Sequence, residues 1–140
     1  MSLDNDMIQG RLDIIERNLQ FFNEYMTMDE EQFLESYKDI QAVKHSLLEI
    51  IESCIDIAGH IISIRGFLRP ESYADTFRVL KNEKIIAQDL AEKLEKMAGF
   101  RNILVHNYED IDNSRIIHFV QNDLDDIKEY IACILNLIKN

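Results

Sequence analysis

Apolar residues recur every three or four positions along almost the whole chain, and this spacing constrains the fold more than any other feature. Because an α-helix turns once in about 3.6 residues, side chains at this spacing share one face that can be buried. The chain has one proline and four glycines in 140 residues, so it has few of the breaks that a turn-rich β fold needs. The sequence therefore predicts an all-α protein.

The apolar pattern divides into four long helices and one short helix. The long helices are predicted around residues 8–22, 40–62, 86–100 and 116–138, and the short one over 73–80. Gly66 suits the left-handed position after a helix, and Pro70 forbids a continuous helix across its segment. Asp112 or Asn113 can cap the last helix. Long helices with short connections predict an antiparallel up-and-down bundle, a single domain over residues 1–140.

The formal net charge of −11 argues against a nucleic-acid partner, because phosphate binding usually draws on a basic surface. The charge is unevenly distributed, however. Residues 65–108 carry eight Lys and Arg against six Asp and Glu, whereas the segments on either side are acidic. Surface charge that averages this way by chance is the simpler explanation. The asymmetry matters only if a functional site lies in the same segment.

Nothing in the sequence predicts export or a membrane location. The N-terminus is acidic and lacks the basic start and apolar run of a signal peptide. No apolar stretch approaches the roughly 20 residues that span a bilayer. Cys54 and Cys133 each lie in an apolar helical pattern, as expected for buried thiols in a reducing compartment. The prediction is a cytoplasmic protein without a membrane partner.

Polar and charged side chains gather in residues 99–108, inside the positive segment. On a helix, Asn102 and His106 lie one turn apart on the same face, and Arg101 lies beside Asn102. The apolar residues of the same helix point in another direction, into the bundle. A helix that ends just after His106 leaves Tyr108 close to it. The spacing therefore presents Arg101, Asn102 and His106 together beside the core face.

These side chains suit the cleavage of RNA through its own 2′-hydroxyl, a nucleophile that DNA lacks. Histidine has an ordinary pKa of about 6.5 and can exchange protons near neutral pH. The planar guanidinium of arginine matches phosphate oxygens, and Asn102 can orient the histidine or donate to the phosphate. The residues fit this chemistry but do not require it. Arginine and histidine near a helix end are more often an ion-pair or capping arrangement.

The ordered set Arg101, Asn102, His106 and Tyr108 resembles the Arg-Asn-x-x-x-His-x-Tyr motif of the HepT family, within the HEPN superfamily. The broader superfamily signature, Arg-x4–6-His, is weak alone, but the flanking sequence is also similar to that family. The similar flanks are residues 56–61, 70–73, Phe77, Leu80, Gly99, Phe100, Ile111 and Asp112. The resemblance extends over about residues 50–135.

The resemblance implies a metal-independent endoribonuclease, without a cofactor, in which Arg101 and His106 are the catalytic pair. It implies the toxin of a toxin–antitoxin pair whose partner is an MntA-type nucleotidyltransferase antitoxin that adenylylates Tyr108. Attached adenylate puts bulk and negative charge where an RNA phosphate must lie. The resemblance also implies a homodimer in which two motifs face one cleft, so that two copies of the positive segment line it.

Several other residues have a structural and a functional interpretation. Asp56 and His60 are an i, i+4 pair on the second long helix, and they either support the site or form a helix-surface ion pair, which is the simpler interpretation. Tyr73 and Phe77 are expected to be packing residues rather than platforms on which bases stack. No cysteine or histidine pair has metal-ligand spacing, so no metal site is predicted.

A function of a different class stays open. A helical bundle of this kind can be a non-catalytic subunit that binds substrate or nucleotide for a nucleotidyltransferase. The acidic composition suits this role better than it suits RNA binding. This alternative predicts no RNA cleavage and no effect of His106→Ala, whereas the intact motif favours the ribonuclease.

Overall fold

The structure, a computed structural model, describes residues 3–106 and 112–139. Within these ranges every regular element is helical, which confirms the all-α prediction. The elements are α1 (Asn5–Phe22), the 3-10 helix η1 (Asn23–Tyr25), α2 (Glu30–Leu34), α3 (Tyr37–Arg65), α4 (Tyr73–Asn82), α5 (Gln88–His106), α6 (Asn113–Asn122) and α7 (Leu124–Lys139).

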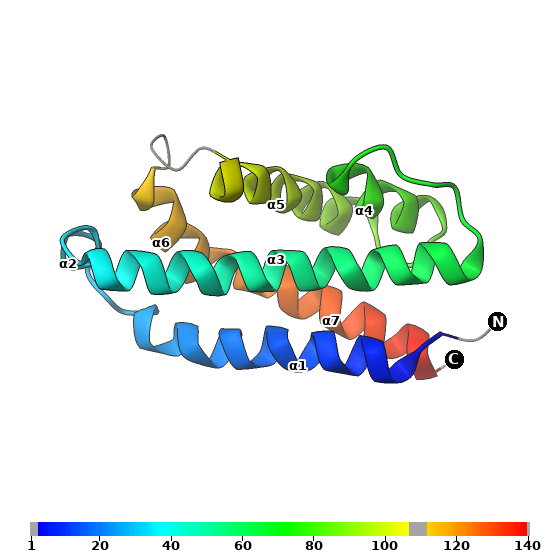
Figure 1. The fold of residues 1–140 in the computed structure, drawn as a ribbon, viewed down its shortest axis with the longest axis horizontal. Helices are drawn as coiled ribbons and strands as arrows, with labels where there is room; N and C mark the ends of the chain where they lie inside the picture. Colours follow the sequence, from blue (N-terminus) through cyan, green and yellow to red (C-terminus); the bar gives the residue numbers. More distant parts are fainter. Residues whose placement is uncertain (1–2, 107–111, 140) are drawn as a thin grey trace.

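The four long helices α1, α3, α5 and α7 run along the long axis of the molecule, each antiparallel to the one before it (Figure 1). The two ends of the chain therefore lie at the same end of the bundle. The short helix α4 packs against α5 and α3. This is the predicted up-and-down bundle of four long helices and a short one.

Helix α3 is the centre of the bundle and packs against α1, α4 and α5. Its buried side chains include Leu47, Ile51 and Ile61, which water does not reach. In the same core the ring of Tyr130 packs edge-on against Phe77, with 5.7 Å between centroids. Its hydroxyl donates to the backbone oxygen of Cys54 at 2.9 Å, so this buried polar group is satisfied.

The predicted helix ends follow from local chemistry. Gly66 has a φ of 65° and ends α3 in the left-handed conformation that only glycine adopts at little cost. Ser72 caps α4 by accepting a hydrogen bond from the backbone N–H of Asp75. Asp112 caps α6 by accepting from the N–H of Ser114. These caps fix where α4 begins and therefore how it meets α5.

The prediction of one last helix is wrong, because the segment is broken at Asp123 into α6 and α7. The side chain of Gln121 donates to the backbone oxygens of Tyr25 and Met28 and ties α6 to the connection before α2. Helix α7 packs instead against α5 and α1. The apolar spacing continues across the break, so periodicity alone does not reveal it.

Both cysteines carry free thiols. Cys54 is buried in the core, as predicted, whereas Cys133 is only half-buried. Burial raises the pKa of both thiols, so neither is activated as a nucleophile. Among the helices that the structure describes, none is both long and apolar enough to cross a membrane. The cytoplasmic location stays a prediction.

Candidate active site

Helix α5 presents the polar end of its sequence beside the core and not within it. Met97 and Leu104 are buried, whereas the side chain of Arg101 is partly buried and Asn102 is exposed. The described part of helix α5 runs to His106. The apolar residues thus anchor α5 and leave Arg101 and Asn102 at the edge of the bundle.

The guanidinium of Arg101 is held by three neighbours from three helices. Its Nη2 lies 3.3 Å from Glu52 Oε1 on α3, and its Nη1 donates to Asn102 Oδ1 at 3.4 Å. Its Cζ lies 4.8 Å from the centre of the Tyr73 ring on α4. The side chain is 18% exposed, so this cation is partly removed from water but still reachable.

These contacts orient Arg101 more than they stabilise the fold. The carboxylate of Glu52 is 45% exposed, and ion pairs with such partners contribute about 0–1 kcal/mol. A guanidinium over an aromatic ring contributes about 0.5–1 kcal/mol at an exposed position. A guanidinium also has more N–H donors than these contacts use. The arrangement therefore leaves an oriented cation that can bind an anion such as phosphate.

The two aromatic residues of α4 differ in burial. Phe77 is buried in the core, whereas Tyr73 is 45% exposed and packs against Arg101. Tyr73 is the first residue of α4, so its ring lies at the edge of the core. The guanidinium of Arg101 lies over this ring. The pairing of Tyr73 with Arg101 was missed because it depends on how α4 and α5 pack.

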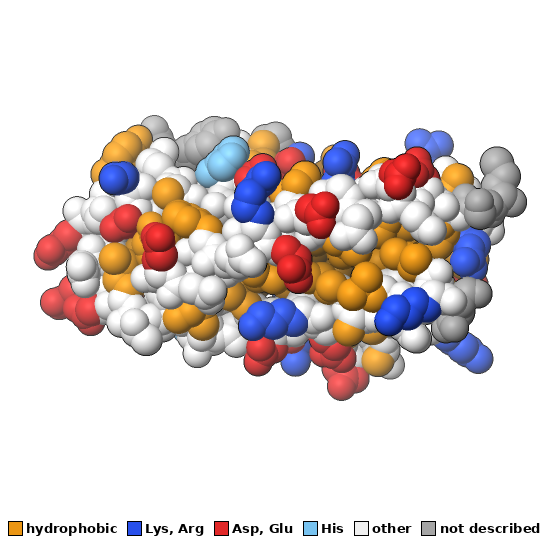
Figure 2. Space-filling model, turned by 90° about the horizontal axis from the view of Figure 1, so that it is seen from below, with side chains coloured by type: hydrophobic (Ala, Val, Ile, Leu, Met, Phe, Trp, Pro, Cys, Tyr) orange, Lys and Arg blue, Asp and Glu red, His pale blue; other side chains and the backbone are white. Residues whose placement is uncertain are grey.

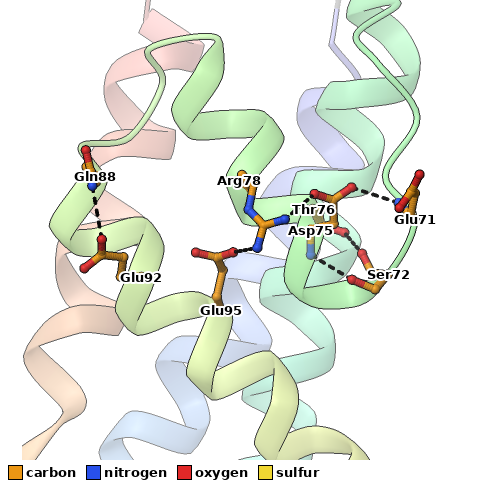
Figure 3. A network of polar contacts seen from close by, with 8 residues as sticks. All are labelled: Glu71, Ser72, Asp75, Thr76, Arg78, Gln88, Glu92 and Glu95. Atoms are coloured by element: carbon orange, nitrogen blue, oxygen red, sulfur yellow. Dashed lines mark hydrogen bonds and ion pairs between the residues drawn. The ribbon is translucent and has the colours of Figure 1, made fainter.

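A network of polar contacts clamps α4 to α5 (Figure 3). Arg78 Nη2 on α4 lies 2.6 Å from Glu95 Oε1 on α5, and its Nη1 lies 3.3 Å from Asp75 Oδ1. The other carboxylate oxygen of Asp75 accepts from the backbone N–H of Glu71 at 2.9 Å. The clamp joins the irregular connection before α4 to α5, and so it fixes Tyr73 relative to α5.

A groove of about 920 Å3 lies between α1, α3, α4 and α5, and two of the residues that line it, Tyr73 and Asn102, contact Arg101. Its walls include Asn102, Asp56 and His60, the three residues that the sequence proposes as supporting the site. Tyr73 and Gly59 line it as well. The structure therefore brings Asn102 from α5 to the same groove as Asp56 and His60 from α3, which are more than 40 positions away in the sequence.

Asp56 and His60 have partners on α1 and at its start. Arg11 Nε lies 3.0 Å from Asp56 Oδ2, and the backbone N–H of Asp4 donates to His60 Nε2 at 2.9 Å. The ion pair between Asp56 and His60, the simpler interpretation of their spacing, is therefore not the arrangement found. Since Nε2 accepts, the neutral imidazole of His60 carries its proton on Nδ1.

Two predicted residues lie at or beyond the limit of what the structure describes. His106 is the last residue of α5, and its side chain is outside the described part. Tyr108 also lies outside the described residues. Among the side chains that are described, no group of three His, Cys, Asp or Glu is placed to hold a metal ion.

Acidic neighbours offset part of the charge of the positive segment. Of its eight Lys and Arg side chains, Arg78, Arg101 and Lys93 form ion pairs, the last with Asp126 on α7 at 3.4 Å. Outside this segment, on the face formed by α1 and α7, basic and acidic side chains are interspersed around apolar ones (Figure 2). The segment is therefore less basic than its composition suggests.

Comparisons with known proteins identify the family and the fold. The sequence profile described as ribonuclease HepT-like matches residues 15–134, which extends further towards the N-terminus than the predicted resemblance over 50–135. The mRNA nuclease HepT of Shewanella oneidensis is 33% identical over 130 residues, which are 93% of this chain and 97% of that protein. The tRNA nuclease HepT of Aphanizomenon flos-aquae is 30% identical over 111 residues, 79% and 75% of the two chains.

Among solved structures, the fold is similar to that of a tri-AMPylated HEPN toxin of Shewanella oneidensis in complex with an MNT antitoxin. The TM-score is 0.86 at 32% identity, and the match covers 95% of this chain and 99% of that chain. The bundle thus has the fold of that toxin over 95% of this chain.

Proposed function

The chain belongs to the ribonuclease HepT-like family, as its motif predicts, and we propose that it is the toxin of a toxin–antitoxin pair. In this proposal it is an endoribonuclease that cuts RNA without a metal ion, with Arg101 and His106 as the catalytic pair. The observation that carries the proposal is Arg101 itself. Its guanidinium is oriented by Glu52 and Tyr73, and two residues that it contacts, Tyr73 and Asn102, line a groove open to solvent.

The reaction uses the 2′-hydroxyl of the RNA as the nucleophile. The 2′-oxygen bonds to the adjacent phosphorus as the bond from phosphorus to the 5′-oxygen breaks, and His106 moves a proton in this exchange. Arg101 binds the phosphate and stabilises the negative charge that grows in the transition state. The products are a 2′,3′-cyclic phosphate and a 5′-hydroxyl.

Three residues support this pair. Asn102 accepts a hydrogen bond from Arg101 and so limits the rotation of the guanidinium. Asp56 and His60 line the adjacent groove, and their bonds to Arg11 and Asp4 hold the start of α1 against α3. We assign all three a positioning role, because none is known to touch the reacting phosphate.

The partner and the modification follow from the similar toxin, which is AMPylated and bound to an MNT antitoxin. By analogy, a nucleotidyltransferase antitoxin binds this chain and adenylylates Tyr108. The added phosphate carries negative charge close to the motif and repels the RNA backbone. A homodimer in which two motifs share one cleft, and a cytoplasmic location, belong to the same proposal.

The test is cleavage of total RNA in the presence of EDTA by the wild-type protein, by Arg101→Ala and by His106→Ala. Intact mass must first establish that Tyr108 is unmodified. Cleavage by the wild type that is lost in both variants supports the ribonuclease. If the unmodified wild type does not cleave RNA, the ribonuclease proposal is wrong and the non-catalytic binding subunit takes its place.

A further inference from the structure

The groove beside Arg101 has features that cleavage of the backbone does not use. Tyr73 lines it with an aromatic ring that is nearly half exposed, although Arg101 lies over that ring. Gly59 also lines it, from the middle of α3. A side-chain carbon at this glycine meets nothing within 4 Å, so packing within the chain does not require glycine there. Its effect is to keep this wall of the groove open.

The polar groups of the groove include both hydrogen-bond acceptors and donors. Asp56 uses one carboxylate oxygen for Arg11, and a carboxylate can accept further hydrogen bonds. His60 accepts from Asp4 through Nε2, which leaves the N–H of Nδ1 as a donor. Asn102 has an amide that both donates and accepts. A flat ring system with polar edges fits such surroundings better than an apolar ligand does.

We propose that this groove, which we call the Tyr73 groove and define by Gly59, Tyr73, Asp56, His60 and Asn102, binds one nucleobase of single-stranded RNA. This inference rests on the proposed function and names the part of the substrate that lies next to the cleaved phosphate. Proteins read single-stranded RNA by stacking bases on aromatic rings and by hydrogen bonds to the base edges.

The two subsites fit one nucleotide step. Arg101 lies against the Tyr73 ring and donates to Asn102, so the cation that binds phosphate and the wall that binds the base are in direct contact. A base inside a duplex cannot enter, because its edges are paired and its faces are stacked. The Tyr73 groove therefore selects unpaired RNA, in which a base can turn away from its neighbours.

A simpler interpretation is that Tyr73 only supports Arg101 and binds no base. A variant at Gly59 distinguishes this interpretation from the base subsite. Gly59→Leu adds bulk to the wall of the groove and leaves the side chains of Tyr73 and Arg101 themselves unchanged. Gly10→Leu is the matched control, because Gly10 is also inside an exposed stretch of helix with nothing within 4 Å of an added carbon, and it does not line the groove. Both changes replace glycine with a better helix former, so neither is expected to unfold the protein.

The experiment measures binding by fluorescence anisotropy. The probe is a single-stranded oligonucleotide with 2′-fluoro sugars, which cannot be cleaved through the 2′-oxygen. A series of further probes each carries one abasic nucleotide, at a different position along the strand. We expect Gly59→Leu to bind the intact probe roughly 5- to 150-fold more weakly, the range for loss of one stacked base, and Gly10→Leu to bind as the wild type does. One abasic position should weaken the wild type by a similar factor and leave Gly59→Leu unchanged.

Cleavage of ordinary RNA is measured in parallel to separate the two proposals. If the wild type cleaves RNA but Gly59→Leu binds the probe as tightly as Gly10→Leu does, the base subsite is wrong and the ribonuclease stands. The same conclusion follows if no abasic position affects the wild type. If the unmodified wild type does not cleave RNA at all, the proposed function is wrong and the base subsite is withdrawn with it.

Discussion

Two grooves lie against α5. They are similar in size, and at each of them an arginine lies over an aromatic ring, but the surroundings of these two contacts differ. The Tyr73 groove has about 920 Å3, and the groove between α5, α6 and α7 has about 820 Å3. In the first, Arg101 lies 4.8 Å from the centre of the Tyr73 ring, and in the second, Arg115 lies 5.2 Å from the centre of the Phe100 ring.

The surroundings decide what each arginine can do. The Phe100 ring is buried, and both carboxylates and the cations Lys93 and Lys96 line the groove beside it. The Tyr73 ring is exposed and lines an open groove. An arginine over an aromatic ring is therefore not a site by itself. The accessibility of the ring is the difference between the two.

The largest expected effect separates the two arginines. Arg101→Ala should lower the rate of RNA cleavage by about 10²–10³-fold, the usual loss when one donor to a developing negative charge is removed. Arg115→Ala should change the rate less than about twofold, because Arg115 lies over a buried ring in the other groove, away from the motif residues. Single-turnover cleavage of a labelled RNA measures both. Equal losses in the two variants would remove the distinction between the grooves.

Removing the two aromatic rings should affect different properties, stability for Phe100 and RNA cleavage for Tyr73. Phe100→Ala removes a buried ring and should lower the free energy of unfolding by about 3 kcal/mol. Tyr73→Ala removes an exposed ring and should cost less than about 1 kcal/mol, yet it should reduce RNA cleavage. Urea denaturation and the cleavage rate of each folded variant measure the two effects. A large loss of stability in Tyr73→Ala would show that the ring belongs to the core.

The two ends of α1 offer a test that uses pH. Near its start, α1 is joined to α3 at the groove by the ion pair of Arg11 with Asp56. After its other end, Tyr25 joins the chain to α3, because its hydroxyl donates to Asp39 Oδ1 at 2.9 Å. Burial, and then the bond to Asp39, raise the pKa of Tyr25 from 10.0 to about 12.

Because the folded state holds the phenol proton more tightly than the unfolded state does, this contribution is complete below pH 10 and is lost as the pH rises towards 12. The loss should reach about 3 kcal/mol. Denaturant unfolding between pH 9 and pH 12 should show this decline in the wild type and a flatter curve in Tyr25→Phe. Identical curves would mean that the hydroxyl does not stabilise the fold.

The smallest effect concerns the carboxylate that competes with RNA for Arg101. Glu52→Gln keeps an acceptor for the guanidinium but removes a negative charge beside the phosphate position. We expect RNA to bind about threefold more tightly, as the removal of one partly screened repulsion predicts. Asp126→Asn is the matched control, since its partner Lys93 lies at the other groove. Weaker binding by Glu52→Gln would mean that its charge is needed to orient Arg101.

The sequence predicts those features that local spacing controls. Periodicity gives the four long helices and α4, and side-chain chemistry gives the ends at Gly66 and Asp112. The position of Arg101 and Asn102 at the edge of the core follows from the same helical geometry.

Features that depend on packing between helices were not predictable. The break at Asp123 arises because α6 and α7 pack on different neighbours. The contact of Arg101 with Tyr73, and the bonds of Asp56 and His60 to α1, join residues far apart in the sequence. For the same reason, the charge of residues 65–108 did not predict the charge of the surface that they form. Ion-pair partners such as Glu52 and Asp126 lie outside that segment.

The central claim is that this chain cleaves RNA through the 2′-hydroxyl at Arg101, and the chemistry of the cut ends tests it most directly. The measurement is mass spectrometry of the fragments that the unmodified protein makes in EDTA from a defined single-stranded RNA. The account predicts 2′,3′-cyclic phosphate and 5′-hydroxyl ends, and no cut where the nucleotide before the cleaved bond is 2′-deoxy. Fragments with 3′-hydroxyl and 5′-phosphate ends, or cleavage at the 2′-deoxy position, would contradict it.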